Sequence, residues 1–168
     1  MPALSFLDLQ EIRFLHASRR HGVSWQTLRQ ASESVKKRLS HDHPFSTGKF
    51  SSYGRRILLD AAKASGDQAL EDIVSNQLGF RSVIALYLQG LEFSQGIVAR
   101  WFPRPDKRIV IDPARSFGQP IVTKEGVPTL VLAKAYRAER SYSKVSRWYE
   151  VDVRSVRAAV EFESRMAA

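Results

Sequence analysis

The sequence predicts a mainly α-helical α+β protein built from two small helix-turn-helix-like domains. Helix-capping residues followed by apolar periodicity occur near both ends of the chain, and a segment with two prolines, WFPRPDKR (101–108), lies between them. Prolines so close together are incompatible with a helix interior and favour extended backbone. We therefore expect a winged helix-turn-helix DNA-binding domain over residues 1–103. A second domain over residues 104–168 should contain a short strand pair and three helices.

The composition indicates a globular protein with an anionic partner. The 168 residues are 43% hydrophobic and carry a net charge of +9. Such a basic balance favours nucleic acid as a partner, although a solubilising surface would also account for it. There is no cysteine, no apolar run of membrane-spanning length and no signal-peptide pattern at the N-terminus. We therefore expect a cytoplasmic protein with no disulfide and no membrane segment.

The first helix is predicted to begin after Ser5. The pattern Ser5-x-x-Asp8 is a capping box, in which the hydroxyl and the carboxylate satisfy free backbone N–H groups. Leu9, Ile12 and Leu15 would continue an apolar face. The helix should end before Gly22, because glycine favours a helix C-terminus.

A second helix should follow from Ser24 after a short turn. Its residues expected to be buried recur at one-turn and two-turn intervals: Leu28, Ala31, Val35 and Leu39. Two helices joined by about four residues that include glycine form a candidate helix-turn-helix.

The next segment, HPFSTGKFSSYGRRILLD (43–60), is predicted to form paired strands. Gly48 and Gly54 would mark turns, and the resulting basic hairpin would serve as the wing. Farther along, we expect a short helix around 81–89 and strands over 91–93 and 97–102.

In the second domain, RIVID (108–112) and IVTK (121–124) are predicted strands. Their edges at 109–111 and 121–123 would be open to pairing with a second copy. Three helices should follow, capped by Thr129, by Ser141 and by Asp152. Val151 and Val156 would form a hydrophobic staple over the last cap.

The candidate base-contacting residues lie at the start of the second helix. In helix-turn-helix proteins this region enters the major groove, where arginine pairs with guanine and glutamine with adenine. Gln26, Arg29 and Gln30 supply those side chains. The same residues would also be ordinary on a solvated helix, so they do not by themselves indicate DNA contact. The neighbouring turn and the expected hairpin favour the DNA interpretation. For Trp25 we expect a partly buried packing role.

Two further sets of basic residues are candidate partner contacts. Lys49, Arg55 and Arg56 on the expected wing would contact DNA phosphates, which position a protein without conferring specificity. The last two helices carry a second basic cluster. It could contact phosphates, an acidic protein surface or only solvent, and we assign it to a toxin partner on the argument given below. Its members are Lys144, Arg147, Arg154 and Arg157.

Neither a metal site nor an enzyme is expected. The sequence His41-Asp42-His43 lacks the ligand spacing of a zinc site and is better explained as a loop before Pro44. There is no phosphate-binding glycine loop, nucleophile elbow or suggestive carboxylate pair. We therefore predict no cofactor.

The order of several short motifs resembles that of VapB-type antitoxins. LSFLDLQEIRF, GVSWQTLRQA, HPFS and ARWFP resemble the MerR-like helix-turn-helix part of these proteins. IDP, GQP, GVPT and SYSKVSRWYEVDVRSVRAAVEFE resemble a C-terminal antitoxin-associated domain of a family long catalogued as of unknown function. The family has a basic residue in a G-T-R-like turn, where this chain has EGVPT. The resemblance covers about residues 4–163.

The resemblance implies an antitoxin of a type II toxin–antitoxin module. Such a protein neutralises a toxin, here expected to be a PIN-domain ribonuclease, and represses its own operator, which we expect it to bind as a homodimer. The basic cluster of the second domain would suit the acidic pocket of a metal-dependent nuclease. Two alternatives remain open: a stand-alone MerR-like transcriptional regulator, and a protein-interaction module that does not bind DNA.

Overall fold

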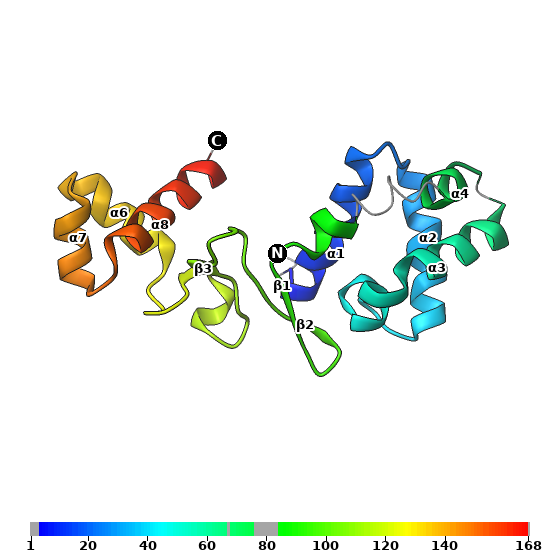
Figure 1. The fold of residues 1–168 in the computed structure, drawn as a ribbon, viewed down its shortest axis with the longest axis horizontal. Helices are drawn as coiled ribbons and strands as arrows, with labels where there is room; N and C mark the ends of the chain where they lie inside the picture. Colours follow the sequence, from blue (N-terminus) through cyan, green and yellow to red (C-terminus); the bar gives the residue numbers. More distant parts are fainter. Residues whose placement is uncertain (1–3, 67, 76–83, 168) are drawn as a thin grey trace. The chain divides into compact units, whose positions relative to one another are not determined.

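The computed structural model describes residues 4–66, 68–75 and 84–167 (Figure 1). The chain forms two compact units. Unit 1 comprises residues 1–89 and 93–98, and unit 2 comprises residues 90–92 and 99–168. Helices account for most of the described chain and the strands are short, which confirms the expected mainly α-helical α+β class.

The regular elements in the described part of unit 1 are helices and one end of a hairpin. Three of its helices begin where short polar side chains accept hydrogen bonds from free backbone N–H groups: Ser5 Oγ from Asp8 N, Ser24 Oγ from Thr27 N, and Thr47 Oγ1 from Phe50 N. Residues 84–88 are also helical, whereas 81–83 of the expected helix lie outside the described residues. The named helices are α1 (Phe6–Arg20), α2 (Trp25–Leu39), the 3-10 helix η1 (Pro44–Ser46), α3 (Gly48–Ser65) and α4 (Gln68–Ser75).

The predicted wing over residues 43–60 is wrong. Pro44–Ser46 forms η1, and α3 then runs without interruption to Ser65. Gly54, expected in a turn, is buried within α3, where an added Cβ would lie 3.1 Å from the Phe50 ring. The absence of a side chain at Gly54 leaves room for the Phe50 ring, so this glycine serves packing and not a turn.

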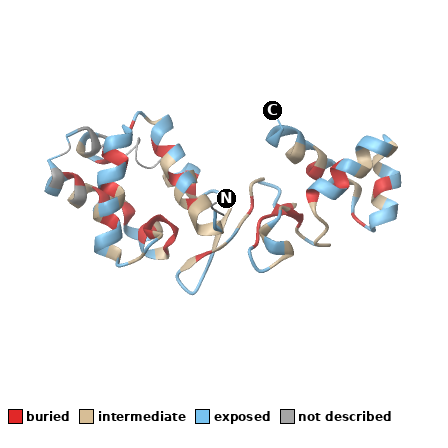
Figure 2. Cartoon of the chain, turned by 180° about the vertical axis from the view of Figure 1, so that it is seen from behind, coloured by how far each residue is buried: buried red, intermediate tan, exposed pale blue. Residues whose placement is uncertain are grey.

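The core of unit 1 is an aromatic cluster. The Phe14 ring lies 4.1 Å from that of Phe45 and 5.0 Å from that of Phe50, and Tyr87 completes the cluster at 5.4 Å from Phe14. All four side chains are buried. The predicted apolar face of α1 is therefore displaced around the helix: Phe14 faces the core, whereas Ile12 is exposed. Figure 2 shows that buried and exposed stretches alternate along the helices.

The boundary between the two units falls within a hairpin. Strands β1 (Leu91–Ser94) and β2 (Ile97–Trp101) pair across a two-residue turn at Gln95 and Gly96, both with positive φ. The expectation of strands in this part of the chain is thus confirmed. Gly48 N at the start of α3 donates a 2.8 Å hydrogen bond to Gly96 O.

The two-proline segment packs within unit 2. Phe102 is buried, and Arg104 forms ion pairs with Asp106 at 3.1 Å and with Glu161 at 2.9 Å. The boundary between the two units lies inside the hairpin, a few residues before the segment in which the sequence predicts the linker.

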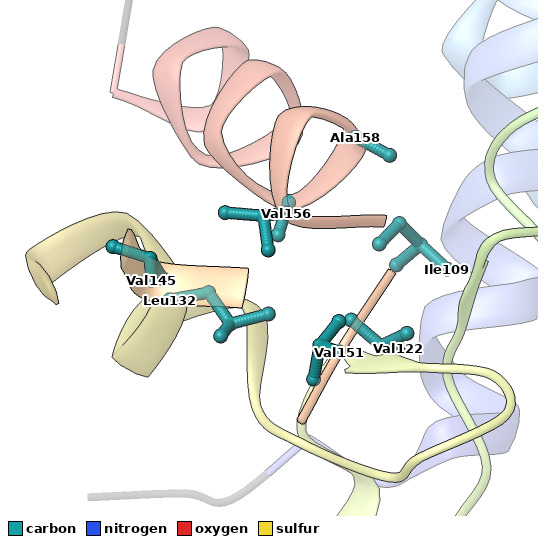
Figure 3. Packing of buried hydrophobic residues seen from close by; sticks show 8 residues of the cluster. Ile109, Val122, Leu132, Val145, Val151, Val156 and Ala158 are labelled. Atoms are coloured by element: carbon teal, nitrogen blue, oxygen red, sulfur yellow. The ribbon is translucent and has the colours of Figure 1, made fainter. Parts of the chain in front are cut away.

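Unit 2 combines a minimal sheet with three helices. The strands pair antiparallel, with Ile109 opposite Val122 and Val110 opposite Ile121. Figure 3 shows aliphatic side chains from the strands and helices converging on one core, which includes Leu132, Val145 and Val156. The elements are β3 (Ile109–Val110), the 3-10 helix η2 (Ser116–Gly118), β4 (Ile121–Val122), α6 (Thr129–Glu139), α7 (Tyr142–Tyr149) and α8 (Val153–Met166).

Two details of unit 2 differ from expectation. The strand edges are largely occupied, because Ile111 exchanges backbone hydrogen bonds with Trp101 and because Val122 N donates to Val127 O. Thr129 is the first residue of α6 and not its cap. Its hydroxyl contacts Pro120 O and the Glu163 carboxylate. Across the described residues, no helix combines the length and the apolar character needed to cross a membrane.

Candidate functional site

The α1–α2 pair has the connection expected of a helix-turn-helix. Helix α1 ends at Arg20, Gly22 adopts φ +89°, and buried Val23 precedes the cap of α2 at Ser24. The predicted inner stripe of α2 is confirmed in its first three turns, where Leu28, Ala31 and Val35 are buried. The helix packs chiefly against α3.

Gln26, Arg29 and Gln30 project from the opposite side of α2 and are exposed. They occupy the first two turns, where a helix-turn-helix would meet base edges. The structure thus brings these three predicted residues together on an accessible surface of unit 1.

Trp25 does not have the packing role expected of it. Its side chain is 62% exposed, and the Arg19 guanidinium lies 5.5 Å from its ring. Trp25 also borders a shallow groove of about 360 Å³ between α1 and α2. Leu15 and Leu28 form its apolar part, and Arg29, Ser32 and Glu33 complete its lining. An exposed tryptophan beside an apolar groove is typical of a protein-binding surface.

The three residues predicted to contact phosphate have different environments on α3. Lys49 and Arg56 are both exposed and lie seven residues apart, which places them on one side of the helix. Arg55 instead donates to Val74 O at 3.1 Å and to Ser75 O at 3.3 Å. It therefore satisfies carbonyl groups at the end of α4, a common role for arginine at a helix C-terminus.

The hairpin that does form lacks the basic tip of the predicted wing. Its turn consists of Gln95 and Gly96, and the charged residues near its base are largely compensated. Glu92 lies 3.1 Å from Lys107 and 3.8 Å from Arg100. Little free positive charge is therefore available for phosphate along this hairpin.

The basic cluster of unit 2 spans α7 and α8. Lys144, Arg147, Arg154 and Arg157 are all exposed. Lys144 lies 3.6 Å from Glu139, whereas the Arg157 guanidinium lies 4.4 Å from the centre of the Tyr142 ring. The structure therefore presents all four predicted residues to solvent, from two adjacent helices.

A partly buried carboxylate in unit 1 is not apparent from the sequence. Glu11 Oε1 accepts hydrogen bonds from Ser46 N and Ser46 Oγ, each 3.0 Å long. Burial raises the pKa of Glu11 to about 7, because desolvation outweighs the stabilising hydrogen bonds. Glu11 and Ser46 are 35 residues apart in sequence, so no local pattern could identify this contact.

The loop expected at His41-Asp42-His43 is present. His41 Nδ1 accepts a hydrogen bond from His43 N, and Asp42 pairs with Lys36 at 2.7 Å. The Lys36 hydrogen bond holds the pKa of Asp42 below its usual range. Within residues 4–66, 68–75 and 84–167, no group of three or more His, Asp or Glu side chains is arranged to hold a metal ion.

The chain is similar to known proteins in both sequence and fold. No family model matches the chain. A Mycobacterium tuberculosis H37Rv protein named "Putative antitoxin VapB45" is 27% identical over 169 residues, covering 94% of this chain and 70% of its own length. The crystal structure of Rv2018 from Mycobacterium tuberculosis matches with a TM-score of 0.75 at 25% identity, covering 94% of this chain and 78% of that one. The similarity supports a relationship between this chain and VapB-type antitoxins.

Proposed function

We propose that this protein is the antitoxin of a type II toxin–antitoxin module, which neutralises a partner ribonuclease and binds its own operator as a repressor. The observation that most supports this function is the similarity to "Putative antitoxin VapB45" over 94% of the chain. The net charge of +9 agrees with an anionic partner such as DNA.

In this proposal, unit 1 contacts the operator through α2. Gln26, Arg29 and Gln30 contact base edges, because they are exposed in the first two turns of the second helix of a helix-turn-helix. Lys49 and Arg56 contact phosphates from α3. Arg55 is less suited to that role, since its guanidinium is engaged by the end of α4.

The toxin in this proposal is a PIN-domain ribonuclease, as the resemblance to VapB-type antitoxins implies. The antitoxin acts as a homodimer, because operators are commonly palindromic and a symmetric dimer matches two half-sites. No enzymatic activity and no cofactor are required for either role.

Binding to the DNA upstream of the gene tests the operator role. Arg29→Ala should lower specific affinity by about 1–3 kcal/mol and relax discrimination at one base pair, while circular dichroism stays unchanged. Unchanged affinity in Ala variants of Gln26, Arg29 and Gln30 would remove α2 from the DNA interface. Co-expression with the neighbouring gene tests the antitoxin role, because the neighbour alone should arrest growth and this protein should restore it.

The groove beside Trp25 favours a second candidate, in which the α2 face binds a protein segment. Its apolar lining and exposed tryptophan suit such a segment better than a phosphate backbone. Trp25→Ala separates the two candidates. Loss of toxin capture with unchanged DNA affinity would indicate a protein-binding groove, whereas the proposed DNA role predicts that Gln26 and Gln30 variants lose DNA and retain the toxin.

A stand-alone transcriptional regulator is distinguished by the same co-expression experiment. Such a regulator would bind DNA upstream of its gene but would neither bind nor neutralise the neighbouring gene product.

A further inference from the structure

Helices α7 and α8 are joined by a tight connection. Helix α7 ends at Tyr149, Glu150 adopts a left-handed conformation with φ 53°, and Val151 is buried in the core of unit 2. Asp152 then caps α8, its carboxylate accepting a 2.6 Å hydrogen bond from Arg154 N. Helix α6 packs against both α7 and α8. Three helices with a three-residue turn between the last two form a helix-turn-helix.

The outer face of α8 carries arginine where the inner face carries small residues. Ser155, Val156, Ala158 and Ala159 are buried, which fixes the orientation of the helix in unit 2. Arg154 and Arg157 consequently share the exposed side within the first two turns. This is the part of a second helix that enters the major groove in helix-turn-helix proteins.

Arg157 is held in place by an aromatic stack. Its guanidinium lies 4.4 Å from the Tyr142 ring centre, and that ring stacks on Tyr136 at 4.1 Å with an angle of 15° between the planes. Tyr142 is the first residue of α7, so this contact also places the start of α7 beside the outer face of α8. A stacked guanidinium keeps its N–H groups available for hydrogen bonds in its own plane.

Lys144 lies 3.6 Å from Glu139, but the carboxylates closest to Arg154 and Arg157 have other partners. Glu161 pairs with Arg104 at 2.9 Å, Asp152 lies 3.7 Å from Arg108, and Glu163 accepts from the Thr129 hydroxyl. In the part of the chain that the structure describes, neither Arg154 nor Arg157 forms an ion pair with a carboxylate. The exposed Glu150 lies in the turn and not on α8.

From this arrangement we propose that α7 and α8 form a second DNA-contacting element, in which Arg154 and Arg157 bind base edges and Lys144 binds a phosphate. Two guanidinium groups on one helix face match the paired acceptors of guanine in the major groove. Arginine is also enriched at protein interfaces, so capture of the neighbouring gene product is measured beside DNA binding in the test below. This assignment is an alternative to the toxin contact predicted for these residues and rests on the operator binding proposed above.

The test uses the full chain and a duplex from directly upstream of its gene, with a scrambled duplex of equal length and composition for comparison. Arg154→Ala and Arg157→Ala should each lower affinity for the upstream duplex about 5- to 150-fold and reduce its preference over the scrambled duplex. Arg137→Ala removes the same charge from an exposed position on α6 and should leave both unchanged.

A charge-conserving variant separates base contact from general attraction. Arg157→Lys keeps the charge but removes the two-pronged hydrogen bonding, so it should lose the preference for the upstream duplex while retaining binding to the scrambled one. Circular dichroism and capture of the neighbouring gene product should remain as in the wild type for all these variants.

Several outcomes would overturn the inference. If the Arg154 and Arg157 variants keep their DNA affinity but lose the toxin, the face is a toxin interface. If the Arg154 and Arg157 variants bind both DNA and the toxin normally while Arg29→Ala loses DNA binding, the operator is bound by unit 1 alone. A wild-type chain that binds neither duplex at low salt would refute both this inference and the operator role. By contrast, loss of DNA binding in Arg154→Ala, with unchanged DNA binding in Arg29→Ala, would support the DNA contact of α8. The same result would exclude α2 from the DNA interface.

Discussion

Tyr87 Oη donates a 2.6 Å hydrogen bond to the backbone carbonyl of Phe45, a residue 42 positions earlier in the chain. Both side chains belong to the aromatic cluster that forms the core of unit 1. The bond joins the short helix at 84–88 to the 3-10 helix η1, and burial raises the pKa of the Tyr87 hydroxyl above its ordinary value. The hydroxyl therefore remains protonated and available as a donor.

Tyr87→Phe should lower the free energy of unfolding by about 1–3 kcal/mol, because it leaves the buried Phe45 carbonyl without its donor. Urea denaturation followed by circular dichroism measures the change. Tyr53→Phe is the matched control, since Tyr53 is 65% exposed on α3 and its hydroxyl is accessible to water. Equal stability of the two variants would show that the Phe45 carbonyl finds water or another donor.

Glu11 should make the stability of the protein depend on pH. Its pKa is about 7 in the folded state against 4.5 for an ordinary glutamate, so the folded protein binds this proton more tightly than the unfolded chain. The free energy of unfolding should consequently fall, on the order of 2 kcal/mol, as pH rises from 4.5 to about 7. Denaturation midpoints measured across that range test this expectation.

Glu11→Gln isolates the contribution of this carboxyl group. The amide oxygen of the variant could still accept hydrogen bonds from Ser46 but would carry no charge. The fall in stability between pH 4.5 and 7 should therefore diminish, and the variant should be the more stable protein at about pH 8. A variant with the same pH profile as the wild type would assign the dependence to other groups.

Gly90 should tolerate no side chain. Its φ is +75°, and an added Cβ would lie 2.0 Å from Phe102 O, the carbonyl of a residue whose N–H donates to Gly90 O. Gly90→Ala should therefore lower the free energy of unfolding clearly more than a strained backbone conformation alone, which costs about 1–3 kcal/mol. Gly66→Ala is the control, because Gly66 has a similar φ of +68° and no atom within 4 Å of its added Cβ. Equal thermal shifts would contradict a steric cause.

The sequence predicts helix starts well where the signal is local. Ser5, Ser24, Ser141 and Asp152 all cap helices as expected, because a cap needs a side chain and backbone only two or three residues away. The segment at 43–60 fails for the opposite reason. Gly54 lies beside the Phe50 ring inside α3. In the sequence alone, a glycine required by packing cannot be distinguished from a glycine in a turn.

The residues proposed to contact partners show the same difference between local and tertiary signals. The exposure of Arg29 and Arg154 follows from the apolar periodicity of their own helices and could be predicted. The engagement of Arg55 by carbonyl groups 19 and 20 residues later could not, since it depends on how α3 and α4 pack. The Glu11–Ser46 contact and the stacking of Arg157 on Tyr142 are likewise tertiary.

Removing Lys49 and Arg56 together should flatten the salt dependence of operator binding. Under the proposed function both side chains neutralise phosphates, and each contact releases condensed counterions when it forms. The slope of log affinity against log salt should therefore become shallower by about 1.8 in Lys49→Ala/Arg56→Ala. Fluorescence anisotropy over a series of potassium chloride concentrations provides this slope, for the upstream duplex and the scrambled one alike.

Arg55→Ala removes a neighbouring positive charge and should behave differently. Its guanidinium bonds to Val74 O and Ser75 O, so the expected loss is in the free energy of unfolding, by about 1–2 kcal/mol, with the salt slope preserved. If the slope of log affinity against log salt became shallower in Arg55→Ala but stayed unchanged in the double variant, the Arg55 guanidinium would leave α4 to bind DNA. An unchanged slope in both would place the phosphate contacts of unit 1 on helices other than α3.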